Sequence, residues 1–175
     1  MSDSARPADD CSKDYGTEGI VAMTPLREGA EAPDFTLESD SGETVSLAQL
    51  RGKPVVLYFY PRDDTPGCTT EACEFRDAWE DVKKTGAVVL GVSPDTAASH
   101  KKFKSKFRLP FPLLADPEHK VAERYGAWGE RSMYGRKFQG ILRTTFVIGP
   151  DGRIKKVFER VKPKGHVSEV LESLQ

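Results

Sequence analysis

The segment VVLYFYPRDDTPGCTTEACEFRDAWEDV, residues 55–82, decides the fold that the sequence predicts. Its first six residues, 55–60, form a continuous apolar, β-branched and aromatic run, which is typical of a strand buried on both faces. Pro61 ends that run. From Cys68 onward, apolar side chains recur at spacings of four and three residues, as along one face of a helix: Cys68, Ala72, Phe75, Trp79 and Val82. The segment therefore predicts a buried strand, a short loop and an amphipathic helix.

The sequence on either side continues the alternation of strands and helices. Further strands are indicated at 35–37, 44–46 and 87–92, and as a hairpin, 144–148 and 154–158, around Asp151-Gly152. Further helices are indicated after a cap at Asp95, with Ala98, Phe103 and Phe107 on the apolar side, at Val121 and Tyr125, and over 166–174. This pattern predicts an α/β fold with a mixed central β-sheet flanked by α-helices.

Length and composition limit the class of protein. A chain of 175 residues is the size of one domain, and its 26 basic and 27 acidic residues lack the basic excess of a nucleic-acid binder. No apolar run approaches the roughly 18–20 residues that span a membrane. The first residues show neither a secretory signal nor an Arg/Ser-rich leader, so we expect a cytoplasmic protein. Residues 1–24 lack apolar periodicity and predict a flexible N-terminal extension, which leaves 25–175 as the folded domain.

Three cysteines, at positions 11, 68 and 73, are too few for the disulfide framework of a small secreted protein. Cys68 is expected in the first turn of its helix, where free backbone N–H groups and the helix dipole favour the nucleophilic thiolate. It also continues the apolar stripe, so that a small buried core residue is an equally good interpretation of Cys68 taken alone.

Cys73 follows Cys68 at a spacing that an intact helix cannot bridge. Five residues of α-helix separate the two Cα atoms by roughly 8.6 Å, which is beyond the approximate 7 Å limit for a disulfide. A bond between them would require the first turns to unwind. The C-x4-C spacing, without further Cys or His at ligand spacing, argues against zinc, and we expect no metal site.

Residues 60–73, YPRDDTPGCTTEAC, resemble the active-site segment of a peroxiredoxin. The family motif P-x-x-x-T-x-x-C is matched by Pro61, Thr65 and Cys68. A second cysteine five residues later is similar to the bacterioferritin-comigratory-protein, or Q-type, branch. The resemblance extends from about residue 31 to the C-terminus and includes Ala32-Pro33-Asp34-Phe35 and Arg143-Thr144-Thr145-Phe146. It implies a thioredoxin-like fold.

The resemblance also implies a role for each cysteine. Cys68 would be the peroxidatic cysteine, which attacks the O–O bond of a hydroperoxide and becomes a sulfenic acid. Cys73 would be the resolving cysteine, which condenses with that sulfenic acid to an intramolecular disulfide. An external dithiol, thioredoxin, would then reduce the disulfide. The implied substrates are hydrogen peroxide and alkyl hydroperoxides, and the implied protein is a monomer that needs no metal or organic cofactor.

Four further residues receive roles from the same resemblance. Thr65 would offer its hydroxyl to the thiolate and the peroxide, and Pro61 would shield the thiolate from water. Arg143 would supply a fixed positive charge, and Glu71 would orient it. Each has a structural alternative. Thr65 could cap the turn and Pro61 could simply end the strand. Arg143 could form a surface ion pair, and Glu71 could be a carboxylate that the helix dipole favours. Their joint occurrence with Cys68 favours the catalytic interpretation.

Some features stay outside this interpretation. Residues 100–106, HKKFKSK, are basic, but Phe103 and Phe107 share one helical face, which favours a solvated amphipathic helix over a nucleic-acid site. Trp128 is expected in a loop, 126–130, and its role is open. The alternative function is a non-enzymatic redox sensor or binding protein that uses the same disulfide switch. Rapid reaction with peroxide and turnover with thioredoxin would distinguish the enzyme from it.

Overall fold

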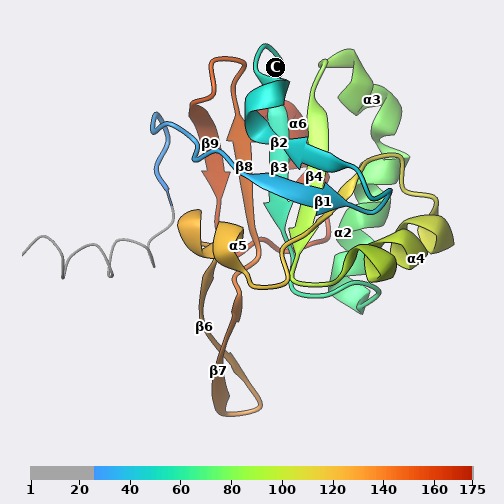
Figure 1. The fold of residues 1–175 in the computed structure, drawn as a ribbon, viewed down its shortest axis with the longest axis vertical. Helices are drawn as coiled ribbons and strands as arrows, with labels where there is room; N and C mark the ends of the chain where they lie inside the picture. The colour runs from blue at the N-terminus through green and yellow to red at the C-terminus, as the bar shows by residue number, and fades with distance from the viewer. Residues whose placement is uncertain (1–25, 175) are drawn as a thin grey trace, which may run out of the picture.

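A seven-stranded mixed β-sheet forms the centre of the computed structural model, which describes residues 26–174 (Figure 1). In spatial order its strands are β2 (Thr44–Ser46), β1 (Thr36–Ser39), β5 (Leu113–Ala115), β4 (Val88–Ser93), β3 (Val55–Phe59), β8 (Thr144–Ile148) and β9 (Ile154–Phe158). β3, β4 and β5 are parallel, whereas the other pairings are antiparallel. The expected mixed central sheet is confirmed. The extension predicted over residues 1–24, with Cys11, lies outside the described residues.

The apolar run of β3 separates two hydrophobic cores, which explains why it shows no alternation. Val55, Leu57 and Phe59 face one core, and Val56 and Tyr58 face the other. The second core is covered by four helices: α2 (Pro66–Asp77), α3 (Trp79–Lys84), α4 (Ala97–Phe107) and α6 (His166–Leu174). The first is covered by the 3-10 turn η2 (Leu47–Leu50) and by α5 (Lys120–Arg124). A strand buried on both faces has no polar positions to alternate with apolar ones.

A two-stranded hairpin, β6 (Trp128–Met133) and β7 (Arg136–Ile141), extends away from the central sheet (Figure 1). The sequence did not predict it, and the expected loop at Trp128 is wrong. Most β7 side chains are exposed, so the hairpin lacks the apolar alternation that marks a half-buried strand. At its base, the Trp128 ring stacks on His119, with the ring centroids 3.6 Å apart. The hairpin leads directly into the segment that contains Arg143.

Two local predictions need correction. The apolar stripe from Cys68 to Val82 is divided between α2 and α3, because Ala78 leaves the helical conformation with φ −94° and ψ 14°. The N-cap of α4 is Thr96, whose side chain accepts a hydrogen bond from the Ser99 amide. The three-residue β5 was also not predicted. Within residues 26–174, no helix combines the length and the apolar character that crossing a membrane requires.

Candidate active site

Cys68 lies in the first turn of α2, close after the carboxyl end of β3. Thr65 precedes the helix in an extended conformation, and Pro66 is the first residue of the helix. Proline lacks a backbone N–H, but at this position the N–H would have no partner within the helix. The free N–H groups of this turn and the helix dipole favour negative charge near the sulfur. Because the Cys68 side chain is only 1% exposed, protein groups determine its environment.

Arg143 supplies the positive charge beside Cys68. β8 runs antiparallel to β3, so Arg143, which directly precedes β8, lies next to the carboxyl end of β3. Its Nη2 donates to the Cys68 Sγ at 3.3 Å, and its Nη1 donates to the Glu71 Oε1 at 2.9 Å. A Cβ at Gly67 would lie 3.2 Å from that Nη2, so glycine at this position leaves room for the guanidinium. The sheet pairing thus unites two groups that are 75 residues apart.

The three groups perturb one another electrostatically. Burial raises the pKa of Glu71 from 4.5 to about 7, and this shift prevails although the charge of Arg143 and its hydrogen bond act to lower it. Burial alone would lower the pKa of Arg143, but the charges of Cys68 and Glu71 and the bonds to both raise it instead. Arg143 therefore stays a cation, while Glu71 changes charge near neutral pH.

Glu71 makes fewer hydrogen bonds than its carboxylate could accept. Its side chain is fully buried, and its Oε2 has no hydrogen-bond partner within residues 26–174. The hydroxyl of Tyr58 is buried and without a partner in the same part of the chain. Burial, followed by the charges of Glu71 and Cys68, raises the pKa of Tyr58 well above its usual range. The interior behind Cys68 is therefore a place where additional negative charge is unfavourable.

Thr65 and Pro61 are half-buried in the loop before α2, but neither is engaged with the sulfur by a hydrogen bond. The Thr65 hydroxyl donates to the Arg62 carbonyl at 3.0 Å. Contact with Cys68 or with a bound peroxide would require rotation of that hydroxyl group. The structure thus unites Cys68, Arg143 and Glu71 directly, whereas Thr65 and Pro61 lie in the preceding loop without a hydrogen bond to the sulfur.

Cys73 also lies on α2, in a half-buried position. Both cysteines are free, and α2 is continuous from Pro66 to Asp77. Burial raises the pKa of Cys73; Arg76 offsets part of this shift, and Asp77 adds to it. This is the dithiol form of the protein, so the unwinding predicted for the disulfide form remains a prediction.

A buried hydrogen-bond network holds the loop between β3 and α2. Asp63 accepts from the Tyr60 hydroxyl at 2.6 Å and from Ser99 at 2.7 Å, and it lies 2.8 Å from the His100 Nδ1. The His100 Nε2 lies 2.9 Å from the Leu114 carbonyl oxygen. The sequence placed His100 with the lysines of 100–106, whereas it is fully buried. The contact between His100 and Asp63 forms because α4 packs against this loop in the folded chain, and no local sequence pattern predicts it.

Asp95 completes this network from the segment after β4. Its carboxylate accepts from the Asp63 amide at 2.8 Å and from the Ser93 hydroxyl at 2.7 Å, which replaces the helix-capping role predicted for it. Ligand atoms of Asp63, Asp95 and His100 lie within 4.8 Å of one another. Each of these side chains is hydrogen-bonded within the network, which fixes the loop between β3 and α2.

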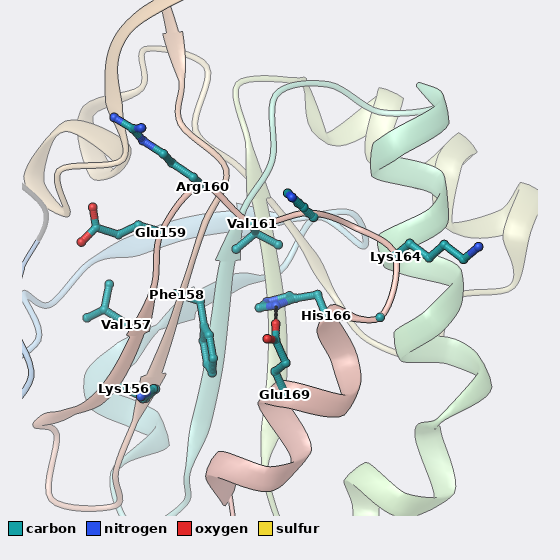
Figure 2. A pocket seen from close by; sticks show the side chains of 11 residues that line it. Lys156, Val157, Phe158, Glu159, Arg160, Val161, Lys164, His166 and Glu169 are labelled. Carbon is teal, nitrogen blue, oxygen red and sulfur yellow. Dashed lines mark hydrogen bonds and ion pairs between the residues drawn. The ribbon is translucent and has the colours of Figure 1, made fainter.

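A hollow of about 610 Å³ lies beside the site, between β9, the loop over 159–165 and the start of α6 (Figure 2). Cys68 does not line it. The hollow borders the site through the loop, because the amide of Val161, which lines the hollow, donates to the Arg143 carbonyl at 3.0 Å. Figure 2 shows His166 and Glu169 at the start of α6, joined by a dashed line that marks their contact.

Comparison with known proteins gives consistent matches. The family model for the AhpC/TSA family matches residues 29–157. A putative peroxiredoxin bcp of Coxiella burnetii is 52% identical over 85% of this chain and 99% of its own. Peroxiredoxin Bcp of Bacillus subtilis is 51% identical over 84% of this chain and 94% of its own. A solved structure of a Xanthomonas campestris bacterioferritin comigratory protein, studied for alkyl peroxide reduction, is 36% identical with a TM-score of 0.79, over 85% and 97% of the two chains.

Proposed function

The chain belongs to the AhpC/TSA family and is a peroxiredoxin with the thioredoxin-like fold, and from that premise we propose the roles of its individual residues. Its relatives establish a peroxidase with an antioxidant function. We propose that Cys68 is the peroxidatic cysteine and Cys73 the resolving cysteine. The contact between the Arg143 Nη2 and the Cys68 Sγ, at 3.3 Å, carries this assignment.

In the first step, the Cys68 thiolate attacks the terminal oxygen of a hydroperoxide. A sulfur–oxygen bond forms while the O–O bond breaks, and the departing alkoxide takes up a proton to leave as an alcohol, or as water from hydrogen peroxide. Cys68 is thereby oxidised to a sulfenic acid and the peroxide is reduced. Arg143 stabilises both the thiolate and the charge that develops on the departing oxygen.

The remaining residues support this step. Glu71 orients the guanidinium through its bond to Nη1. Thr65 turns its hydroxyl toward the thiolate and the peroxide, which requires it to leave the Arg62 carbonyl. Pro61 limits the access of water to the sulfur. These roles agree with the positions of the residues: Glu71 lies on α2, one turn after Cys68 begins the buried face, and Thr65 and Pro61 lie in the loop before the helix.

The second step regenerates the enzyme. Cys73 displaces hydroxide from the sulfenic sulfur, and the two cysteines form a disulfide with release of water. A dithiol protein, thioredoxin, then reduces the disulfide by exchange. We propose hydrogen peroxide and alkyl hydroperoxides as substrates, a monomer as the active form, and the cytoplasm as its location. No metal or organic cofactor enters either step.

The test is a single-turnover reaction of the reduced protein with one equivalent of hydrogen peroxide, followed by intact mass and tryptophan fluorescence. We expect a rapid reaction in which the protein loses two hydrogen atoms, and no such product in Cys68→Ser. Thioredoxin with its reductase should then restore the dithiol form. A reaction as slow as that of a free thiol would overturn the assignment and would favour a redox sensor that uses the same pair.

A further inference from the structure

Disulfide formation between Cys68 and Cys73 requires part of α2 to lose its helical conformation. The helix is continuous from Pro66 to Asp77 in the dithiol form. Five helical residues hold the two Cα atoms roughly 8.6 Å apart, whereas a disulfide needs less than about 7 Å. The resolving step therefore includes the breaking of contacts that hold α2 in place. Those contacts influence how fast Cys73 reaches Cys68.

Glu74, directly after Cys73, makes one of these contacts. Its carboxylate accepts from the Gly165 amide, with Oε1 at 2.9 Å and Oε2 at 3.2 Å from the nitrogen. Gly165 immediately precedes α6, where N–H groups lack helical partners and the helix dipole favours an anion. The loop that contains Gly165 connects β9 to α6 along the side of the hollow (Figure 2). We call the contact between Glu74 and Gly165 the α2–α6 latch.

The other anchors of α2 lie on either side of the latch. On the N-terminal side, Arg143 holds Cys68 and Glu71. On the C-terminal side, the fully buried ring of Phe75 stacks on Tyr58 with centroids 5.1 Å apart, and Arg76 donates to the Phe107 carbonyl at 2.8 Å. Cys73 lies between the two sets, and its backbone cannot move toward Cys68 without displacing the adjoining Glu74.

We infer that Glu74 is a positioning residue for the resolving step, an inference that rests on the proposed function. The latch keeps α2 helical and Cys73 away from Cys68, and it must open before the disulfide forms. While it is closed, the Cys68 sulfenic acid is exposed to a second peroxide, which would oxidise it to a sulfinic acid and leave as an alcohol. The latch thus sets the partition between disulfide and sulfinic acid.

The experiment measures the resolving step in Glu74→Gln and Glu74→Ala by rapid quenching, alkylation and intact mass. A charge-assisted hydrogen bond at a helix N-terminus is worth enough to change a rate by about three- to tenfold if it is absent from the transition state. We expect disulfide formation to accelerate by that factor, more in the alanine variant. The peroxide concentration that converts half of the chains to sulfinic acid in one turnover should rise in proportion.

Two control variants separate the latch from other effects. Glu80→Gln removes an exposed carboxylate of α3, which pairs with Lys83 at 3.0 Å, and it should leave the resolving rate unchanged. Val121→Ala truncates a buried α5 side chain in the hydrophobic core on the other face of the sheet, and it lowers overall stability without altering the contact between α2 and α6. If Val121→Ala accelerates resolution as much as Glu74→Ala does, general destabilisation explains the effect and the inference is overturned.

The first oxidation is measured in the same samples, because the charge of Glu74 also acts on the pKa of Glu71. A resolving rate in both Glu74 variants equal to or below that of the unchanged protein overturns the latch and leaves the proposed function intact. Failure of the unchanged protein to form any disulfide after rapid oxidation of Cys68 would overturn the role of Cys73 and the latch together. Acceleration confined to the Glu74 variants supports the inference.

Discussion

The two ends of α2 present their cysteines to different surroundings. Cys68 is almost completely buried and accepts a hydrogen bond from the Arg143 guanidinium in the first turn of the helix. Cys73 is half-buried, and burial raises its pKa more than the neighbouring Arg76 lowers it. The cation directed at the Cys68 sulfur comes from the segment before β8, whereas the charged groups that act on Cys73, Arg76 and Asp77, belong to its own helix.

In the proposed mechanism, this difference divides the chemistry between the two thiols. The first step needs a nucleophilic thiolate, so the protein places a permanent cation and free N–H groups at Cys68. In the second step a proton must reach the oxygen that leaves as water. The raised pKa of Cys73 keeps its thiol protonated until the attack, and the proton is transferred to that oxygen as the sulfur–sulfur bond forms. A thiolate at both positions would add a second negative charge to an interior that disfavours it.

The carboxylates on the same helix repeat the contrast. Glu71, near Cys68, is fully buried, with one oxygen bonded to Arg143 and the other without a partner within residues 26–174. Glu74, near Cys73, is only half-buried and holds the start of α6. The Cys68 end is therefore arranged to control charge, and the Cys73 end is held by a contact that can open. The predictions that follow test each side of that comparison.

The largest effect is expected from Arg143→Gln. Loss of a preorganised cation from a buried site of charge development typically lowers a rate by about 10²- to 10³-fold. We expect a decrease of that size in the second-order rate of Cys68 oxidation, measured by stopped-flow tryptophan fluorescence. Arg143→Lys should recover only part of it, because an ammonium cannot reproduce the planar pair of donors to Cys68 and Glu71.

Arg136→Gln is the matched control for that prediction, since Arg136 is exposed on the β6–β7 hairpin. It should leave the oxidation rate within about twofold of the unchanged protein, as is usual for an exposed residue outside the site. If Arg143→Gln lost less than about threefold, the free N–H groups of the first helical turn would be sufficient alone, and the contrast between the two ends of α2 would no longer depend on the guanidinium.

Much of the fold could be predicted because its signals are local. The apolar run 55–60, the helical stripe from Cys68, the hairpin 144–158 and the helix 166–174 all match elements of the structure. The elements that were missed have weak local signals. β5 has three residues, and the β6–β7 hairpin is mostly exposed, so neither shows a hydrophobic period.

The site was predictable to a different degree. The spacing of Cys68 and Cys73 and the expected first turn of a helix are sequence properties, whereas the position of Arg143 came from a family resemblance and depends on how β8 pairs with β3. The network of Asp63 with His100 could not be foreseen, because it joins residues 37 positions apart and one of them sits in a lysine-rich run. Long-range contacts between polar groups leave no periodic trace in a sequence.

The second prediction concerns the pH dependence of stability that Glu71 introduces. The pKa of Glu71 is raised from 4.5 to about 7 in the folded protein, so the folded state binds its proton more tightly than the unfolded state does. The stabilisation that comes from this tighter proton binding is fully present below pH 4.5 and is lost as the pH rises through about 7. The shift corresponds to a loss of about 3 kcal/mol in the free energy of unfolding.

Glu71→Gln should remove that loss, because the amide resembles the protonated acid at every pH. Urea denaturation of the reduced protein should therefore find similar stability at pH 5 and a more stable variant at pH 8. Parallel stability curves for Glu71→Gln and the unchanged protein would mean that Glu71 keeps its charge throughout this range.

The smallest effect on the first step is expected from Cys73→Ser. Because burial raises the pKa of Cys73, the thiol is neutral near pH 7 and its replacement by a neutral hydroxyl leaves the charge around Cys68 unchanged. The rate of Cys68 oxidation should stay within about twofold, as for a substitution outside the reacting groups. The sulfenic acid should then persist, react with dimedone, and become a sulfinic acid with a second equivalent of peroxide. A tenfold change in the first oxidation would show that the two ends of α2 are coupled electrostatically, and that the division of chemistry between them is incomplete.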